Sequence, residues 1–184
     1  MPPIARFLIV SGLPASGKSS LGRALAQALG VPLLDKDALL EALFEERGVG
    51  DAAWRRQLSQ AADLRLQQQA TNLPAAVLVS WWRHPRSSGE SGTPTDWLAS
   101  LPAPLVEVHC RCSPALAAQR FFSRTRHPGH LDQRWTQTDL LATFDEQALL
   151  GPLRLGPWLE VDTEQPLDLG AVMAALVAAP ANPE

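Results

Sequence analysis

The most constraining feature of the sequence is a glycine-rich turn that directly follows a short apolar run. Residues 7–10 are apolar, and Gly12 and Gly17 come next with four residues between them. Lys18 and Ser19 directly follow the second glycine. Glycines carry no Cβ, so they let the backbone turn tightly and let a ligand come close. This G-x-x-x-x-G-K-S spacing is that of the P-loop, and it predicts a strand, a phosphate-binding loop and a helix in that order.

Each part of such a loop helps to hold a polyphosphate. Successive loop amides and the free N–H groups at a helix N-terminus form a concavity that binds anions. Lys18 adds a positive charge for the β- and γ-phosphates, and the Ser19 hydroxyl can ligate Mg²⁺. We therefore expect a nucleoside triphosphate to bind here. The expected phosphate-binding residues are Gly12, Leu13, Pro14, Ala15, Ser16, Gly17, Lys18, Ser19 and Ser20.

Strands and helices alternate along the chain. Apolar runs of strand length occur at residues 7–10, 31–34, 75–79, 105–112 and 158–161. Helical spacing of apolar residues covers 21–29, 38–47, 52–70, 138–150 and 169–179. A further helix is expected to begin after Ser113, with Pro114 at its first position. This alternation is typical of a mostly parallel sheet with helices on both faces, so we expect one α/β domain over residues 1–184, frayed at 180–184.

Composition narrows the class of protein. The net charge is −3 and the isoelectric point is about 5.8, whereas proteins that bind nucleic acids are more often basic. No run approaches 18 apolar residues, so we expect no membrane span. Cys110 and Cys112 stand two apart in an expected strand, which is a poor geometry for a disulfide. Two buried thiols fit a reducing compartment, and we expect a cytoplasmic protein.

Two carboxylates follow the second expected strand. Ligands of open α/β sheets gather at the carboxyl ends of the strands, so Asp35 and Asp37 should face the γ-phosphate. We expect Asp37 to accept the proton of a substrate hydroxyl or to orient it. We expect Asp35 to lie nearer to Mg²⁺ and to act through water. The alternative is that one of the pair, most readily Asp37, only caps the helix that begins at Ala38.

Three arginines precede a Pro-Gly break. Arg120 and Arg124 are four residues apart and should share one helix face, and Arg126 follows them. Such a cluster predicts a mobile lid, about residues 120–135, that closes on the triphosphate. A lid arginine can stabilise the charge of a transferring phosphoryl group. The alternative is a basic helix face that only meets solvent.

These motifs resemble those of the P-loop kinases. GLPASGKSS, then DKD after the second strand, then an arginine-rich segment with RTRHPGH occur in the order found in shikimate, gluconate, adenylylsulfate and chloramphenicol kinases, 5′-hydroxyl polynucleotide kinases and zeta-toxin-like kinases. The resemblance covers nearly the whole chain, and it is greatest to a branch described as AAA-family ATPases. It implies a three-layer α/β sandwich, the P-loop NTPase fold, with a five-stranded parallel sheet in the order 2-3-1-4-5. It also implies ATP rather than GTP.

The resemblance also implies roles for single residues. Asp37 matches the base. Arg120 is expected near the adenine, and Arg124 or Arg126 is expected to reach the phosphates. The loop that begins at Thr163 and ends at residue 166 is expected to flank the adenine.

Two positions depart from the kinase pattern. Many of these kinases end the third strand with an aspartate, but this strand ends Val79-Ser80-Trp81. The metal would therefore depend on Ser19 and Asp35. In the polynucleotide kinases an arginine stands three residues after the base, where this chain has a leucine, and this difference argues against a nucleic-acid acceptor.

The segment after the third expected strand is the candidate for substrate recognition. Trp81, Arg83 and Arg86 combine aromatic and cationic groups, which suit a ring-bearing or anionic molecule. The alternative for the pair Trp81 and Trp82 is that one packs in the core. Since the histidines near residue 130 have no accompanying acid or thiol cluster, they more readily form a turn than a metal site.

The sequence thus predicts an ATP- and Mg²⁺-dependent kinase that phosphorylates a hydroxyl of a small molecule, with Lys18, Asp37 and Arg124 as catalytic residues. One alternative changes the acceptor to a 5′-hydroxyl nucleic-acid end or a nucleotide-sugar. Another alternative is a nucleotide-binding regulatory module with weak ATPase activity. The sequence leaves the acceptor and the oligomeric state open.

Overall fold

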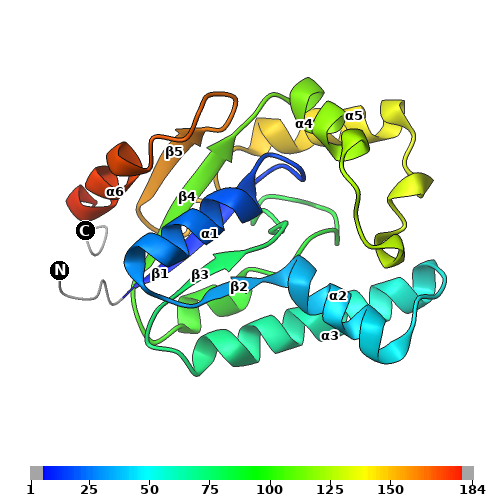
Figure 1. Ribbon diagram of the computed structural model, residues 1–184, viewed down its shortest axis with the longest axis horizontal. Helices are drawn as coiled ribbons and strands as arrows, with labels where there is room; N and C mark the ends of the chain where they lie inside the picture. Colours follow the sequence, from blue (N-terminus) through cyan, green and yellow to red (C-terminus); the bar gives the residue numbers. More distant parts are fainter. Residues whose placement is uncertain (1–5, 180–184) are drawn as a thin grey trace.

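The computed structural model describes residues 6–179, and its centre is a sheet of five parallel strands (Figure 1). Their order across the sheet is β2-β3-β1-β4-β5. The strands are β1 (Phe7–Gly12), β2 (Leu33–Asp35), β3 (Ala76–Val79), β4 (Leu105–Arg111) and β5 (Trp158–Asp162). The predicted strands and the order implied by the resemblance are therefore confirmed. The frayed end expected at 180–184 lies outside the described residues.

The helices follow the predicted stretches closely. Those of the described residues are α1 (Lys18–Leu29), α2 (Lys36–Arg47), α3 (Ala52–Thr71), α4 (Pro114–Ser123), α5 (Gln137–Leu150) and α6 (Leu169–Ala178). Short 3₁₀ turns add η1 (Asp96–Ser100), η2 (Pro128–His130) and η3 (Asp132–Arg134). Local chemistry sets their ends. Gly30 ends α1 in the left-handed region at φ 66°, and Asp51 begins α3 by accepting a hydrogen bond from the Trp54 N–H at 2.9 Å.

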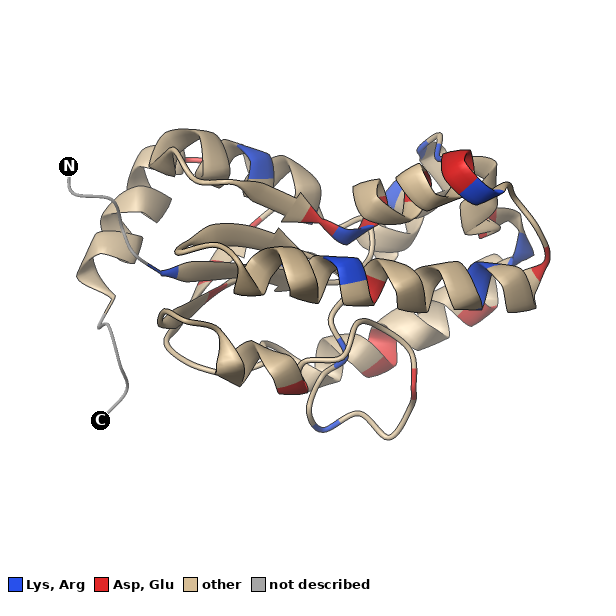
Figure 2. Ribbon diagram, turned by 90° about the horizontal axis from the view of Figure 1, so that it is seen from below, with Lys and Arg blue, Asp and Glu red and all other residues tan. Residues whose placement is uncertain are grey.

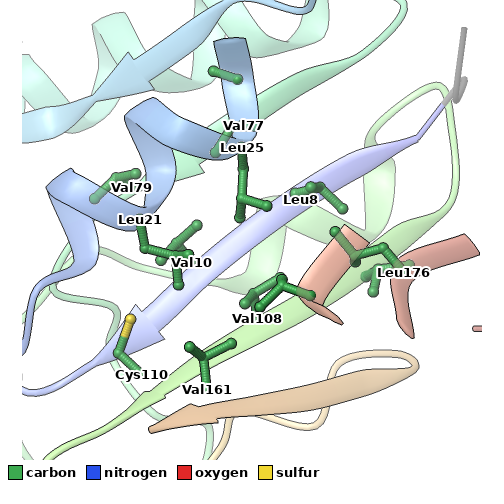
Figure 3. Packing of buried hydrophobic residues seen from close by; sticks show 13 residues of the cluster. Leu8, Val10, Leu21, Leu25, Val77, Val79, Val108, Cys110, Val161 and Leu176 are labelled. Carbon is green, nitrogen blue, oxygen red and sulfur yellow. The ribbon is translucent and has the colours of Figure 1, made fainter. Parts of the chain in front are cut away.

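Helices cover both faces of the sheet, which gives the three layers. Leu8 of β1 packs in the same cluster as Leu25 of α1 and Leu176 of α6 (Figure 3). Its neighbour Ile9 points to the opposite face and packs with Leu66 of α3. Because β1 is buried on both faces, it reads as a continuous apolar run, as expected for the centre of a parallel sheet.

Helix α1 lies very close to the sheet because Gly22 has no side chain. A Cβ at Gly22 would come within 2.4 Å of Val79 Cγ2 on β3. This close approach brings the N-terminus of α1 toward the carboxyl ends of β1 and β3. The phosphate loop therefore sits where the strand ends converge.

The two ends of the described chain meet at the other end of the strands. Arg6 Nη1 donates to the Leu176 carbonyl at 3.1 Å, beside the start of β1 and within α6. Lys, Arg, Asp and Glu gather toward the end of the molecule that lies away from the termini (Figure 2). None of the helices in the described part of the chain combines the length and hydropathy of a membrane-spanning segment.

Candidate active site

The P-loop joins β1 to α1 with a backbone that requires its two glycines. Gly12 and Gly17 adopt φ angles of 129° and 97°, which other residues rarely adopt. A Cβ on Gly12 would lie 2.6 Å from the Cys110 carbonyl oxygen of β4. Gly17 begins α1 without a side-chain cap, so side chains do not occupy the first N–H groups of the helix. Those groups can therefore face a phosphate.

Lys18 lies buried at the base of this loop. Its Nζ donates to the Leu13 carbonyl at 2.6 Å, which holds the ammonium beneath the loop. Burial lowers the pKa of Lys18 to about 8, although Asp37 partly opposes this shift. A bound polyphosphate would supply the negative charge that the buried ammonium lacks.

The two aspartates of the DKD motif have different environments. Asp35 accepts a hydrogen bond from the Asp37 N–H at 3.0 Å, so Asp35 is the N-cap of α2. Burial raises the pKa of Asp35, while the Ser19 side chain opposes the shift. The residue that caps is therefore Asp35, and the alternative in which Asp37 caps a helix starting at Ala38 is wrong, because α2 begins at Lys36.

Asp37 is left free to face the cavity. About half of its side-chain surface is exposed, and one oxygen, Oδ2, accepts a hydrogen bond from Arg126 Nη2 at 2.5 Å. Partial burial would raise the pKa of Asp37, but Arg126, His130 and Lys18 outweigh it and hold the pKa below its ordinary value. Asp37 is therefore an ionised carboxylate with a second oxygen that is not used by this ion pair.

The arginines of the predicted lid do not share one helix face. Helix α4 ends at Ser123, whose hydroxyl donates to the Arg120 carbonyl at 3.2 Å. Arg124 is already extended, with φ −86° and ψ 147°, and Arg126 lies beyond it. The prediction that Arg120 and Arg124 lie on one face of a helix is therefore wrong.

Arg124 and Arg126 nevertheless both reach the cavity. Arg126 binds Asp132 at 3.1 Å as well as Asp37, and Arg124 Nη2 lies 3.8 Å from Asp132. The Arg124 guanidinium stacks on the Phe121 ring at 4.7 Å. Its buried Nε has no hydrogen-bond partner among the described residues. A cation in this state is suited to an anionic ligand.

The segment between α4 and α5 is fastened to α2. His130 Nε2 and Glu41 Oε1 are 2.8 Å apart, and His127 Nε2 and Glu45 Oε1 are 3.0 Å apart. The Phe44 ring stacks on His127, with centroids 5.1 Å apart. These contacts fit the expectation that the histidines form a turn.

Arg120 lies on the other side of the P-loop. Its Nη2 donates to the Thr163 carbonyl at 3.0 Å, and Thr163 lies against Gly17. The Thr163 hydroxyl donates to the Arg111 carbonyl at 2.9 Å, which fixes the loop after β5. The two residues expected to flank adenine are thus in direct contact.

One cavity of about 420 Å³ lies beside the P-loop. Its walls include the P-loop, both aspartates of the DKD motif and all three arginines of the predicted lid. Trp81 lines it at the end of β3. The alternative that one tryptophan of the pair packs in the core also holds, because Trp82 is buried and its Nε1 donates to the Val10 carbonyl at 3.0 Å.

The other expected substrate residues lie outside this cavity. Arg83 donates to the backbone carbonyls of Glu90 and Gly92, and Arg86 Nη2 donates to the Leu150 carbonyl at 2.6 Å. Arg83 instead lines a second cavity, of about 270 Å³. Gly12 and Leu13 of the P-loop also line this second cavity, so Arg83 shares a cavity with the P-loop, but not the one that holds Lys18 and Asp37. Trp81 lines both cavities, and Arg86 lines neither.

Several residues that the sequence analysis did not single out also line the P-loop cavity. They include Arg55 on α3, Phe121 and Ser123 on α4, Asp132 in η3 and Trp135 after it. Arg55 Nε donates to the His130 carbonyl at 2.8 Å. The only sequence signal for Arg55 was the polar face of its helix, which by itself indicates solvent.

The structure carries no metal, but the donor set can be compared with the needs of Mg²⁺. Mg²⁺ takes one or two protein oxygens together with phosphate oxygens and several waters. Ser19 and Asp35 supply a hydroxyl and a carboxylate that line the same cavity. Among residues 6–179 no three His, Cys, Asp or Glu side chains gather as a metal cluster.

Cys110 and Cys112 are both buried and unpaired, as predicted. Burial raises the pKa of the Cys110 thiol to about 12, so it stays protonated. His109 is partly buried and has a partner, since its Nδ1 lies 2.8 Å from Ser11 Oγ.

Comparison with known proteins agrees with this geometry. A family model described as an AAA domain matches residues 7–139, from the start of β1 into α5. The chain belongs to this AAA domain family. The matched part of the AAA domain includes the P-loop, the DKD motif and the arginine segment.

Solved structures place this AAA domain among the P-loop kinases. A proposed kinase from Chloroflexus aurantiacus is 29% identical with a TM-score of 0.78, over 95% of this chain and 98% of that one. A gluconokinase from Sinorhizobium meliloti is 25% identical with a TM-score of 0.50, over 95% and 90%. A shikimate kinase from Acinetobacter baumannii, solved with shikimate, has a TM-score of 0.57 over 96% and 94%, and at 19% identity it shows the fold alone.

A stronger but much shorter likeness exists to curated shikimate kinases. The protein of Mycobacterium ulcerans is 64% identical over 33 residues, and that of Mycobacterium tuberculosis is 61% identical over the same length. The match spans about a fifth of the length of these relatives. The chain is thus a member of the P-loop kinase superfamily, and its own acceptor needs a separate argument.

Proposed function

We propose that this protein is an ATP- and Mg²⁺-dependent kinase that transfers the γ-phosphoryl group to a hydroxyl of a small molecule. The observation that carries the proposal is that Lys18, Asp37 and Arg124 line one cavity beside the P-loop. Phosphoryl transfer needs a phosphate cradle, a group that orients the nucleophile and cations that follow the migrating charge. Each of these needs has a residue in this cavity.

In this proposal Asp37 orients the acceptor hydroxyl and accepts its proton as the oxygen attacks. Its low pKa keeps it ionised, and the ion pair with Arg126 fixes the direction of the carboxylate. Lys18 and Arg124 offset the negative charge that develops on the phosphoryl oxygens. Arg120 and Thr163 flank the adenine. Mg²⁺, when bound near Ser19 and Asp35, would neutralise charge on the phosphates.

The acceptor side of the cavity favours an anionic hydroxy compound, such as a hydroxy acid. Arg55 lines the cavity in addition to Arg124, which the proposal assigns to the phosphoryl group. A guanidinium pairs well with a carboxylate or a phosphate. The segment at 120–135 would open and close over this acceptor.

ADP release from Mg²⁺-ATP tests the proposal directly. The panel should hold hydroxy acids, sugars, aminoglycosides, nucleosides and a 5′-hydroxyl oligonucleotide. An acceptor should stimulate the wild type and the Asp145→Asn control, whose aspartate is exposed on α5. The Asp37→Asn variant should lose at least about 100-fold in kcat, the range for a general base. Full activity of Asp37→Asn would overturn the role of Asp37.

Two other functions remain as outcomes of the same panel. Stimulation by the oligonucleotide or a nucleotide-sugar alone would favour that acceptor class, although the net charge of −3 argues against nucleic acid. Tight ATP binding with no stimulated turnover would favour a regulatory module, and the missing acid after β3 is its best support.

The two free thiols support a cytoplasmic location.

A further inference from the structure

The end of β3 holds a serine where many P-loop kinases have an acid. Val79 pairs with Val10 of β1 and with Asp35 of β2, so Ser80 follows at the point where three strands end. Ser80 is 4% exposed and lines the P-loop cavity together with Ser19 and Asp35. The serine therefore shares a cavity with the residues that would hold Mg²⁺.

Ser80 is the first member of a buried chain of polar groups. Its Oγ lies 2.5 Å from Thr93 Oγ1, and Thr93 Oγ1 donates to Asp63 Oδ1 at 2.8 Å. The same Asp63 oxygen accepts from Lys36 Nζ at 2.7 Å. The chain thus runs from the cavity wall, through a threonine that is fully buried, to an ion pair between α3 and α2.

Counting protons fixes the direction of every hydrogen bond in this chain. A hydroxyl has one proton to donate, and Thr93 gives its proton to Asp63. Thr93 can therefore only accept from Ser80, and Ser80 must donate. The Ser80 oxygen is left with lone pairs but no proton to offer to the cavity. Toward a ligand that reaches it, this oxygen can act only as an acceptor, as a carboxylate does.

Backbone hydrogen bonds hold Thr93 beside Ser80. The Thr93 N–H donates to the Trp81 carbonyl at 2.7 Å, and the Thr93 carbonyl accepts from the Arg83 N–H at 2.8 Å. Gly92 has φ 92°, and a Cβ on it would lie 2.9 Å from the Arg83 backbone nitrogen. The long loop after β3 thus folds back and places Thr93 beside Ser80.

We propose that Ser80 takes the place of the missing acid and accepts a hydrogen bond from the water shell of the Mg²⁺–nucleotide complex. Thr93, Asp63 and Lys36 are positioning residues, because their only effect is to make Ser80 donate its proton to Thr93. The inference rests on the proposed function, since it requires a Mg²⁺-bound nucleotide. Ser80 would give a chain without this acid another group that contacts the water shell of the metal.

Calorimetry of ATP binding with Mg²⁺ and with EDTA tests the inference without measuring turnover. The ratio of the two Kd values reports how strongly the metal strengthens binding. Ser80→Ala should reduce this ratio about three- to tenfold, the effect of one lost hydrogen bond, and leave the Kd in EDTA unchanged. Thr93→Val should reduce it similarly, because the Ser80 proton is then free to turn toward the water. Thr93→Ser keeps the hydroxyl and should keep the ratio.

Ser100→Ala is the matched control, since this exposed hydroxyl donates only to the Trp97 carbonyl in η1. Thermal melting should verify that each variant folds. A Ser80→Ala ratio equal to that of the wild type would overturn the inference and leave the proposed function standing. Equal weakening with Mg²⁺ and with EDTA would also overturn it, because that result indicates a purely structural role. Wild-type binding that does not depend on Mg²⁺ would overturn both proposals.

Discussion

The buried Lys18 makes the proton balance of nucleotide binding measurable. In the free protein burial lowers the pKa of Lys18 to about 8. Bound phosphates place negative charge beside the ammonium, which favours its charged form and raises the pKa again. The occupied site therefore binds more protons than the free site wherever free Lys18 is partly neutral. Binding must take up protons from about pH 8 toward the ordinary lysine pKa of 10.5.

The size of this uptake follows from the same pKa. The neutral fraction of free Lys18 is about 0.1 at pH 7, about 0.5 at pH 8 and about 0.9 at pH 9. Phosphate groups titrate near pH 6, below this window, so they contribute little. Calorimetric titration of Mg²⁺-ATP in buffers of different ionisation enthalpy gives the number of protons bound. We expect the uptake to follow these three fractions.

A proton uptake that stays constant from pH 7 to pH 9 would refute this reasoning. Lys18→Arg is the matched control, because an arginine keeps the positive charge and stays protonated throughout. The uptake should disappear in this variant even if its affinity for ATP is lower. An uptake that persists in Lys18→Arg would assign the proton to another group.

Three further substitutions test packing and roles. Gly22→Ala should lower the free energy of unfolding by about 1–3 kcal/mol in urea denaturation, because the added Cβ would overlap Val79. Gly170→Ala in α6 is the control, since its Cβ meets no such neighbour. Equal stabilities of the two variants would contradict the packing of α1 on the sheet. Arg124→Gln should lower kcat at least about 100-fold with little change in the Kd of ATP, and a loss below tenfold would argue against its role. Arg55→Gln should raise the KM of an anionic acceptor about 10- to 100-fold and leave the KM of ATP unchanged; an equal rise of both would indicate a general disturbance.

Much of the fold could be predicted because its signals are local. The P-loop spacing and the buried run of β1 each lie within a few consecutive residues, and both are where the pattern indicated. Gly30 ends α1 as its position suggested. The end of α4 was harder to predict, since no glycine or proline marks the extended conformation that Arg124 adopts after Ser123.

The parts of the site that escaped prediction depend on contacts between distant segments. Arg55 lines the cavity only because α3 packs beside a turn that lies 75 residues further along the chain. The sequence suggests a free cation at Arg83, yet the Arg83 guanidinium donates hydrogen bonds to carbonyls of its own loop. The direction of the Ser80 proton depends on three other side chains from three elements. No period or motif in the sequence contains this information.

The contact between Arg6 and Leu176 has a consequence for engineering. Because the start of β1 and the end of α6 lie side by side, a short linker could join residue 6 to residue 179. New termini could then open in the exposed turn at residues 48–51, between α2 and α3. Such a circular permutant would keep every strand of the sheet intact. The new ends would lie next to α2, which carries Asp37, and next to α3, which carries Arg55. A reporter placed at these ends could therefore sense how the two helices move when an acceptor binds.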